Sequence, residues 1–388
     1  MRNWKVFWIA VLLLLGTAFA QDEPLKVGFI YVGPVGDAGW TYAHDLGRVA
    51  TEAALPGIET TIVESVAEAD VESFIDQLVA DGNKVIFTTS FGYGDGTLAA
   101  AERYPDVIFG HATGIERAPN VMTYIAEMYQ TYYIDGLIAG ALTESNKIGY
   151  VAAFPIPEVK RHIDAFALGA KEVNPDAVVE VRWLNAWFDP AGAKEATEAL
   201  ISDGADVFAF TEDTPTVVQT AGEKGLPSYS HYASMYDFSP DTVVSGQLVK
   251  WEAIYTDFLS KVLDGTYDST NLEDVDYVWR MGEDAVEVGA KPGMVVNPVY
   301  EDALKAKMVN DPELGEVSVY DLVTKRIEQM MMAEPMFEPF TGPITDCAGN
   351  EILAAGQQAT IPELFSLQWA ADNVSGPWSG GPGYDECN

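Results

Sequence analysis

Short apolar runs alternate with amphipathic stretches over the first half of this chain. Residues 26–32 predict a strand and residues 39–54 a helix, and the apolar spacing over residues 69–82 is that of a second helix, which Gly82 ends. Further strands are expected at residues 59–65, 84–90 and 106–112. Because strands that alternate with helices form parallel sheets covered on both faces, we predict an α/β fold.

The same pattern returns after residue 146. The stretch KIGYVAAFPIPE at 147–158 repeats the opening at an offset of 121 residues, and LISDGADVFAF at 200–210 repeats LVADGNKVIFT at 78–88 at an offset of 122. Strands are expected at 147–154, 177–184 and 205–211, and helices at 163–173, 192–204 and 216–225. We therefore predict two doubly wound parallel-sheet lobes with a cleft between them, and a helix over residues 125–144 that separates them.

Each lobe is expected to contain more than one segment of the chain. Residues 242–248 predict a strand at a crossing between the lobes, and residues 251–265 a helix that packs back on the first lobe. We assign residues 21–124 and about 248–280 to lobe 1, residues 125–247 and about 281–345 to lobe 2, and residues 346–388 to a C-terminal tail. Cys347 and Cys387 both lie in this tail, and we predict that a disulfide between them pins it in an oxidising compartment.

The N-terminus has the pattern of an export signal. A positively charged start and an apolar core at residues 6–15 precede Ala18 and Ala20, which form a small-residue cleavage site before Gln21. The alternative, a membrane anchor, is disfavoured because a bilayer span needs about 20 apolar residues. No cysteine lies near the cleavage site for lipid attachment. We expect a cleaved signal peptide at residues 1–20 and a mature protein that is periplasmic or extracellular.

Charge and motif spacing narrow the function classes. The formal net charge of −37 disfavours nucleic acid and anionic membranes as partners, and we interpret it as an adaptation for solubility. The glycine-rich loops lack both the dinucleotide fingerprint and the lysine of a P-loop, and the four histidines have no metal-ligand spacing. We therefore expect no cofactor, no metal and no nucleic acid partner.

Several ordered motifs resemble one known family. They are GDAGWTYAHDLGR (36–48), MYQTYYIDGLIAGALT (128–143), KIGYVAAFPIPEVKRHIDAFALGAKEVNP (147–175), AWFDPAGAKEATEALISDGADV (186–207) and PFTGPITDCAGN (339–350). With these motifs the chain resembles the basic membrane protein family of ABC-transporter substrate-binding proteins, whose characterised members look like binders of purine nucleosides or nucleobases. The resemblance implies a type I periplasmic-binding-protein fold, in which two doubly wound lobes are joined by a three-segment hinge.

The chain departs from the family in the loop after the first strand. Many members carry Lys-Ser-Phe-Asn there, whereas this chain has Ala38-Gly39-Trp40-Thr41. Trp40 thus replaces a stacking Phe, and the Asn carboxamide is absent, which disfavours a contact to ribose. The branch of the family that has this loop, and Trp-Phe-Asp-Pro as at residues 187–190 here, looks more similar to proteins that bind nucleobases, and adenine in particular.

The candidate site residues lie in the loops that follow the strands, because ligands of open α/β sheets bind beyond the carboxyl ends of the strands. Aromatic side chains that suit stacking on a flat ring are Trp40, Tyr42, Phe91, Trp187 and Phe188. Phe188, like Phe154, is equally compatible with packing in the core.

Polar candidates near the same loops are Asp37, Ser90, Asp95, Glu127, Glu212, Asp213, His231 and Lys250. Asp95 and Asp213 hold equivalent positions in the two repeats, and each is also compatible with a helix cap. Lys250 is also compatible with a solvated charge at the hinge. His162 is expected at the surface of its helix.

We expect a monomeric solute-binding protein whose lobes close over a purine and deliver it to an ABC permease in the cytoplasmic membrane. An adenine-like base is favoured as the small-molecule ligand, and a nucleoside comes next. A sugar, an amino acid or a sensor role stays open, because aromatic loops also suit a sugar. An enzyme that processes nucleosides, with Asp37 or Asp95 as base, is disfavoured because no paired nucleophile and base is evident.

Overall fold

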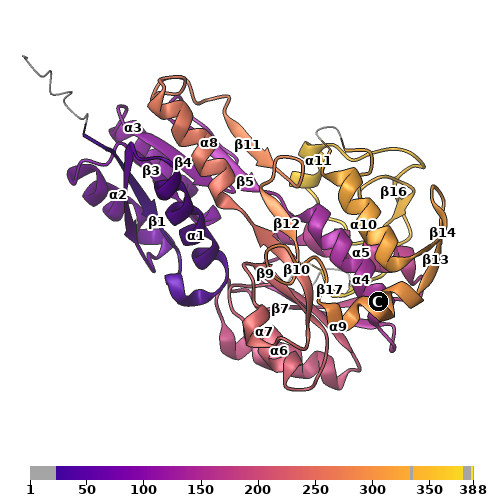
Figure 1. Cartoon of the computed structure of the whole chain (residues 1–388). Helices are drawn as coiled ribbons and strands as arrows, with labels where there is room; N and C mark the ends of the chain where they lie inside the picture. The colour runs from indigo at the N-terminus through magenta and orange to yellow at the C-terminus, as the bar shows by residue number, and fades with distance from the viewer. Residues whose placement is uncertain (1–22, 333–334, 379–385, 388) are drawn as a thin grey trace, which may run out of the picture.

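The computed structural model describes residues 23–332, 335–378 and 386–387, the last two by their backbone, and contains two α/β lobes side by side (Figure 1). Residues 1–20, where we expect the signal peptide, lie outside the described residues. None of the described helices combines the length and apolar character needed to cross a bilayer.

The first lobe is built around a six-stranded parallel sheet with the order β11-β5-β4-β3-β1-β2. Its strands are β1 (Leu25–Ile30), β2 (Ile58–Val63), β3 (Val85–Thr88), β4 (Ile108–Ala112), β5 (Val121–Ala126) and β11 (Asp276–Trp279). Its helices are α1 (Trp40–Ala54), α2 (Val71–Ala80), α3 (Gly94–Arg103) and α8 (Trp251–Leu263). Successive residues of β1 face opposite sides of the sheet: Phe29 contacts Tyr255 of α8, and Ile30 packs in a cluster with α2 and α3.

The second lobe contains an eight-stranded sheet with the order β12-β10-β9-β8-β6-β7-β17-β18. Its strands are β6 (Lys147–Ala152), β7 (Val178–Trp183), β8 (Val207–Thr211), β9 (Ser228–Tyr232), β10 (Val243–Val249), β12 (Val286–Val288), β17 (Val374–Pro377) and β18 (Glu386–Cys387). Its helices are α4 (Tyr129–Leu142), α5 (Pro157–Val173), α6 (Pro190–Ser202), α7 (Thr216–Gly222), α9 (Pro298–Ala306), α10 (Val319–Met330) and α11 (Ile361–Phe365). The central strands are parallel, and β12 and β18 pair antiparallel at the two edges. The predicted α/β fold with two doubly wound lobes is confirmed.

The chain passes between the two sheets three times, after β5, after β10 and after β11. The helix expected to return to the first lobe is α8, which packs on α1 so closely that a Cβ on Gly47 would lie 2.6 Å from the Cβ of Trp251. These three crossings therefore tie the lobes together in the way expected for a hinged binding protein.

Two segments differ from their sequence-based prediction. The helix expected over residues 125–144 begins only at Tyr129, because residues 125–126 complete β5. This helix, α4, is buried on nearly every face and packs against α5 through small residues: a Cβ on Gly136 would lie 2.1 Å from the Phe166 carbonyl oxygen. Residues 374–377 of the expected C-terminal tail form β17, which pairs with β7.

Cys387 belongs to β18 and lies opposite Gly376 in the strand pairing. Its side chain lies outside the described residues, so the disulfide with Cys347 stays a prediction. The strand pairing holds β18 at the edge of the second sheet.

Candidate functional site

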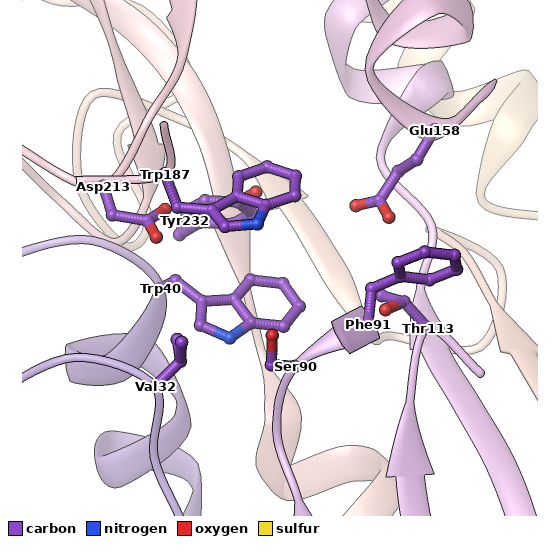
Figure 2. Close-up of a pocket in the computed structure, with 9 residues that line it drawn as sticks. All are labelled: Val32, Trp40, Ser90, Phe91, Thr113, Glu158, Trp187, Asp213 and Tyr232. Atoms are coloured by element: carbon purple, nitrogen blue, oxygen red, sulfur yellow. The ribbon is translucent and has the colours of Figure 1, made fainter. Parts of the chain in front are cut away.

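A small cavity lies where the two lobes meet (Figure 2). Residues from the first lobe that line it are Val32, Trp40, Ser90, Phe91 and Thr113, and those from the second lobe are Glu158, Trp187, Asp213 and Tyr232. Each of them lies at or just beyond the carboxyl end of a parallel strand, from β1, β3 and β4 in one lobe and from β6, β7, β8 and β9 in the other. The cavity therefore occupies the position at which open α/β sheets bind their ligands.

Two tryptophans approach the cavity from opposite lobes. Trp40 is 7% exposed, donates from Nε1 to the Thr89 carbonyl oxygen at 2.6 Å, and meets Tyr232 and Trp251 edge to face. Trp187 is half-buried and contacts the Phe154 ring with a centroid distance of 5.2 Å. Figure 2 shows the Trp187 indole above that of Trp40, with Phe91 to one side. Aromatic faces in this arrangement suit a flat ring.

The loops of the two lobes touch beside these tryptophans. A Cβ on Gly39 would lie 3.0 Å from the Cα of Asp213, so only glycine lets the two backbones approach this closely. The backbone N–H of Asp213 donates to the Trp187 carbonyl oxygen at 2.8 Å, which joins the loops after β7 and β8. The cavity walls are thus set by contacts between lobes as well as within them.

Two residues that line the cavity have strained backbones. Thr113 and Tyr232 hold φ angles of 56° and 61°, in the left-handed region that bulky residues rarely occupy. Such a conformation costs about 1–3 kcal/mol and persists only where the surroundings impose it, most often at functional sites.

Two carboxyl groups face the cavity without a hydrogen-bond partner. No described residue donates a hydrogen bond to the carboxyl group of Asp213, which is 5% exposed, or to that of Glu158. Burial raises the pKa of Asp213 well above its ordinary value, and the charges of Asp37, Glu212 and Glu158 raise it further. Burial also raises the pKa of Glu158, against the opposing effect of Arg161.

The described lining residues include no Lys, Arg or His. A phosphate or carboxylate ligand would therefore meet two acidic groups and no cation. The cavity suits a neutral or cationic ligand that has an aromatic or flat body and N–H or O–H donors at its edge.

The structure brings five predicted residues together at the cavity: Trp40, Ser90, Phe91, Trp187 and Asp213. Tyr42 and Phe188 do not line it and are 36% and 51% exposed. Asp95 lies in the first turn of α3 and borders a separate surface cavity beside Phe91.

Asp37 has a local structural role at the start of α1. Its carboxylate accepts the backbone N–H groups of Gly39, Thr41 and Tyr42 at 2.8, 2.9 and 2.9 Å. Burial raises the pKa of Asp37 and these hydrogen bonds oppose the increase. The carboxylate stabilises the loop that presents Trp40 and does not line the cavity.

Three further candidates lie away from the cavity. Glu127 is buried at the first crossing, where it accepts hydrogen bonds from Arg161 and His162. His231 is buried beside Tyr132, with 2.9 Å between its Nδ1 and the Tyr132 hydroxyl. Lys250 forms an ion pair with Asp284 near the second crossing, which matches the alternative of a hinge charge.

The prediction that His162 lies at the surface was wrong. Its side chain is 1% exposed and its Nε2 lies 3.0 Å from Glu127 Oε1, while its ring stacks on Tyr132. The helix that carries it packs against α4, so polar residues on this side are buried among partners.

Sequence reasoning missed Glu158, Tyr232, Thr113 and Val32 as residues of the cavity. One signal for Glu158 was present, because it ends the repeated stretch 147–158, which begins with β6. Tyr232 had no such signal, since β9 was not among the predicted strands.

Comparisons with known proteins show the family, and two relatives are named for different ligands. A family model described as Bmp, ABC transporter substrate-binding protein PnrA-like, matches residues 25–319. A purine-binding protein of Brucella abortus is 38% identical over 363 residues, which cover 93% of this chain and 96% of that protein. A protein of Haloferax volcanii named as a candidate ABC transporter glucose-binding protein is also 38% identical, over 75% of this chain and 74% of its own length. Among solved structures, an ABC transporter solute-binding protein of Aeropyrum pernix has a TM-score of 0.64 at 19% identity, over 79% of this chain and 91% of that chain.

Proposed function

This chain belongs to the Bmp family of PnrA-like ABC transporter substrate-binding proteins, and we propose that it captures a free purine base, adenine by preference, between its two lobes. The observation that carries the proposal is the pair of indoles from opposite lobes, Trp40 and Trp187, beside the unpartnered carboxyl of Asp213. A purine offers two flat faces to the indoles and N–H donors to the carboxyl group.

The size of the cavity favours a base over a nucleoside. The cavity is small and is lined from both lobes by bulky aromatic side chains, which leave little room beside a flat ring. A ribose would add volume and hydroxyl groups that need buried polar partners. The nucleoside therefore comes second in this proposal.

A sugar is the second candidate, because two observations favour it. The Haloferax volcanii relative is named for glucose. Carboxyl groups without a partner, such as those of Asp213 and Glu158, also accept hydrogen bonds from hydroxyl groups well. The placement of one large indole above the other favours a flat conjugated ring over a puckered one.

The proposed transport role is supported by the family, whose members are substrate-binding proteins of ABC transporters, and by the export signal expected at residues 1–20. We propose that residues 1–20 are cleaved, that the mature protein is an unlipidated monomer outside the cytoplasmic membrane, and that it delivers its ligand to an ABC permease. Mass spectrometry of the N-terminus of the exported protein tests the cleavage, and a retained or lipid-modified terminus would contradict it.

Calorimetric titration of the purified mature protein tests the ligand. Adenine, adenosine, glucose and glutamate form the panel, together with choline, because an aromatic site with acidic groups also suits a quaternary ammonium ion. We expect adenine to bind with a dissociation constant of about 1 μM or tighter, and at least about tenfold more tightly than adenosine. Equal or tighter binding of adenosine would assign the site to nucleosides, and binding of glucose or choline without adenine would overturn the purine proposal.

A further inference from the structure

Asp213 differs from the other acidic groups buried around the cleft. Asp37 accepts three backbone N–H groups, and the other acid of the same loop, Glu212, accepts the Thr214 hydroxyl at 2.9 Å. The carboxyl group of Asp213 is more than nine-tenths buried, and no described residue donates to either of its oxygens. Buried polar groups are hydrogen-bonded in nearly all native structures, so an unpartnered carboxyl calls for an explanation.

The carboxyl group of Asp213 is directed toward the ligand cavity. Figure 2 shows it beside the space between the two indoles, with Glu158 on the far side of Trp187. Its backbone is fixed by the hydrogen bond to Trp187 and by the contact with Gly39. The side chain therefore has a defined position from which it can accept a hydrogen bond from one edge of a ring that lies between the tryptophans.

We propose that Asp213 is a specificity-determining residue that selects purines with an exocyclic amino group over purines that carry only oxo groups. This inference rests on the proposed function and goes further, since it names the group on the base that is recognised. Glu158 is a second acceptor on the same cavity, and no described Lys, Arg or His side chain lines the cavity to favour an oxo group.

The selection follows from which atoms can donate. When ionised, the carboxyl group of Asp213 accepts hydrogen bonds only, and an amino group supplies two N–H donors that favour this ionised form. An oxo group in the same position would place its lone pairs against the carboxylate and would leave the buried charge unpartnered. Asp37, Glu212, Glu158 and the Tyr232 hydroxyl are the titratable groups that interact with Asp213, and none of them is a cation that could reverse this preference.

Adenine and hypoxanthine provide the matched pair of ligands, because they share a ring system and differ in the group at position 6 and in the hydrogen that hypoxanthine carries on N1. We expect the wild-type protein to bind adenine at least about tenfold more tightly than hypoxanthine by calorimetry at pH 8. In Asp213→Asn the carboxamide both donates and accepts, so the ratio of the two affinities should fall to within about threefold. If this variant does not fold, Asp213→Ser, whose hydroxyl also donates and accepts, carries the same comparison.

Asp95→Asn is the matched control, since Asp95 is an acidic residue that follows a strand of the first lobe and does not line the cavity. It should leave the ratio at the wild-type value. A ratio unchanged in both Asp213 variants, or equal binding of adenine and hypoxanthine by the wild type, would overturn the inference and leave the purine proposal intact. Failure of every purine to bind the wild type would instead refute the proposed function.

Discussion

Glu127 and Asp213 are both acidic residues buried near the junction of the lobes, and their surroundings are opposite. Glu127, at the first crossing, accepts hydrogen bonds from Arg161, His162 and the backbone N–H of Tyr129. Asp213, at the cavity, accepts none from any described residue. Burial alone therefore does not tell a structural carboxylate from one that is available to a ligand, whereas the number of its partners does.

The pKa values of Glu127 and Asp213 shift in opposite directions because their hydrogen-bond partners and neighbouring charges differ. Burial by itself would raise the pKa of Glu127, but the Arg161 charge and the hydrogen bond to His162 hold it below its ordinary value. Burial raises the pKa of Asp213 and nearby negative charges raise it further. Ionisation at Glu127 stabilises the fold, while ionisation at Asp213 costs stability until a donor arrives.

The largest expected effect is that of Glu127→Gln. This change leaves the buried Arg161 without its counter-charge, which should lower the free energy of unfolding by about 3–5 kcal/mol in urea titrations at pH 7. Because the pKa of Glu127 is lowered, its contribution in the wild type should be present above its ordinary value of 4.5 and be lost as the pH falls below it. Glu158→Gln is the control and should cost no stability; equal losses in both variants would contradict the comparison.

Trp187→Ala should weaken adenine binding by about 2–4 kcal/mol, the range of an anchoring aromatic side chain. The neighbouring Phe188→Ala is the matched control, because Phe188 is exposed and does not line the cavity. Unchanged affinity in Trp187→Ala by calorimetry would remove this indole from the site. Trp40→Ala is a less clean test, since Trp40 also packs on His44 and Trp251 in the core.

Asp213→Asn should change stability in the direction opposite to Glu127→Gln. Removal of an unpartnered buried charge should raise the free energy of unfolding of the ligand-free protein by about 1–3 kcal/mol at pH 8. The gain in stability should shrink as the pH falls, because the pKa of Asp213 in the wild type is raised and its carboxyl group becomes protonated and neutral. Urea titrations that show a loss of stability at pH 8 would mean that the carboxylate has a structural partner.

The smallest effect is expected for Lys250→Ala. Its ion pair with Asp284 is partly exposed, so the change should alter the free energy of unfolding by less than about 1 kcal/mol and leave adenine affinity unchanged. A tenfold or larger loss of affinity would show that Lys250 contacts the ligand and would return it to the site.

The amino-acid sequence by itself determined the two-lobed α/β plan and the loops that line the cavity. Alternation of strands and helices, and its repetition at an offset of 121 residues, depend on local periodicity that any single segment shows. Trp40, Phe91, Trp187 and Asp213 were identified because all parallel strands end at the same edge of a sheet.

Only the tertiary structure decided what each polar candidate does. Asp37 and Asp213 both follow a strand, yet one meets three backbone N–H groups and the other meets none. Arg161, which donates to Glu127, is 34 residues away on α5. Tyr232 lines the cavity with a left-handed backbone conformation that the local sequence does not predict. Whether a buried carboxyl group has hydrogen-bond partners depends on donors that the fold brings together from distant segments. Local sequence patterns do not predict which donors those are.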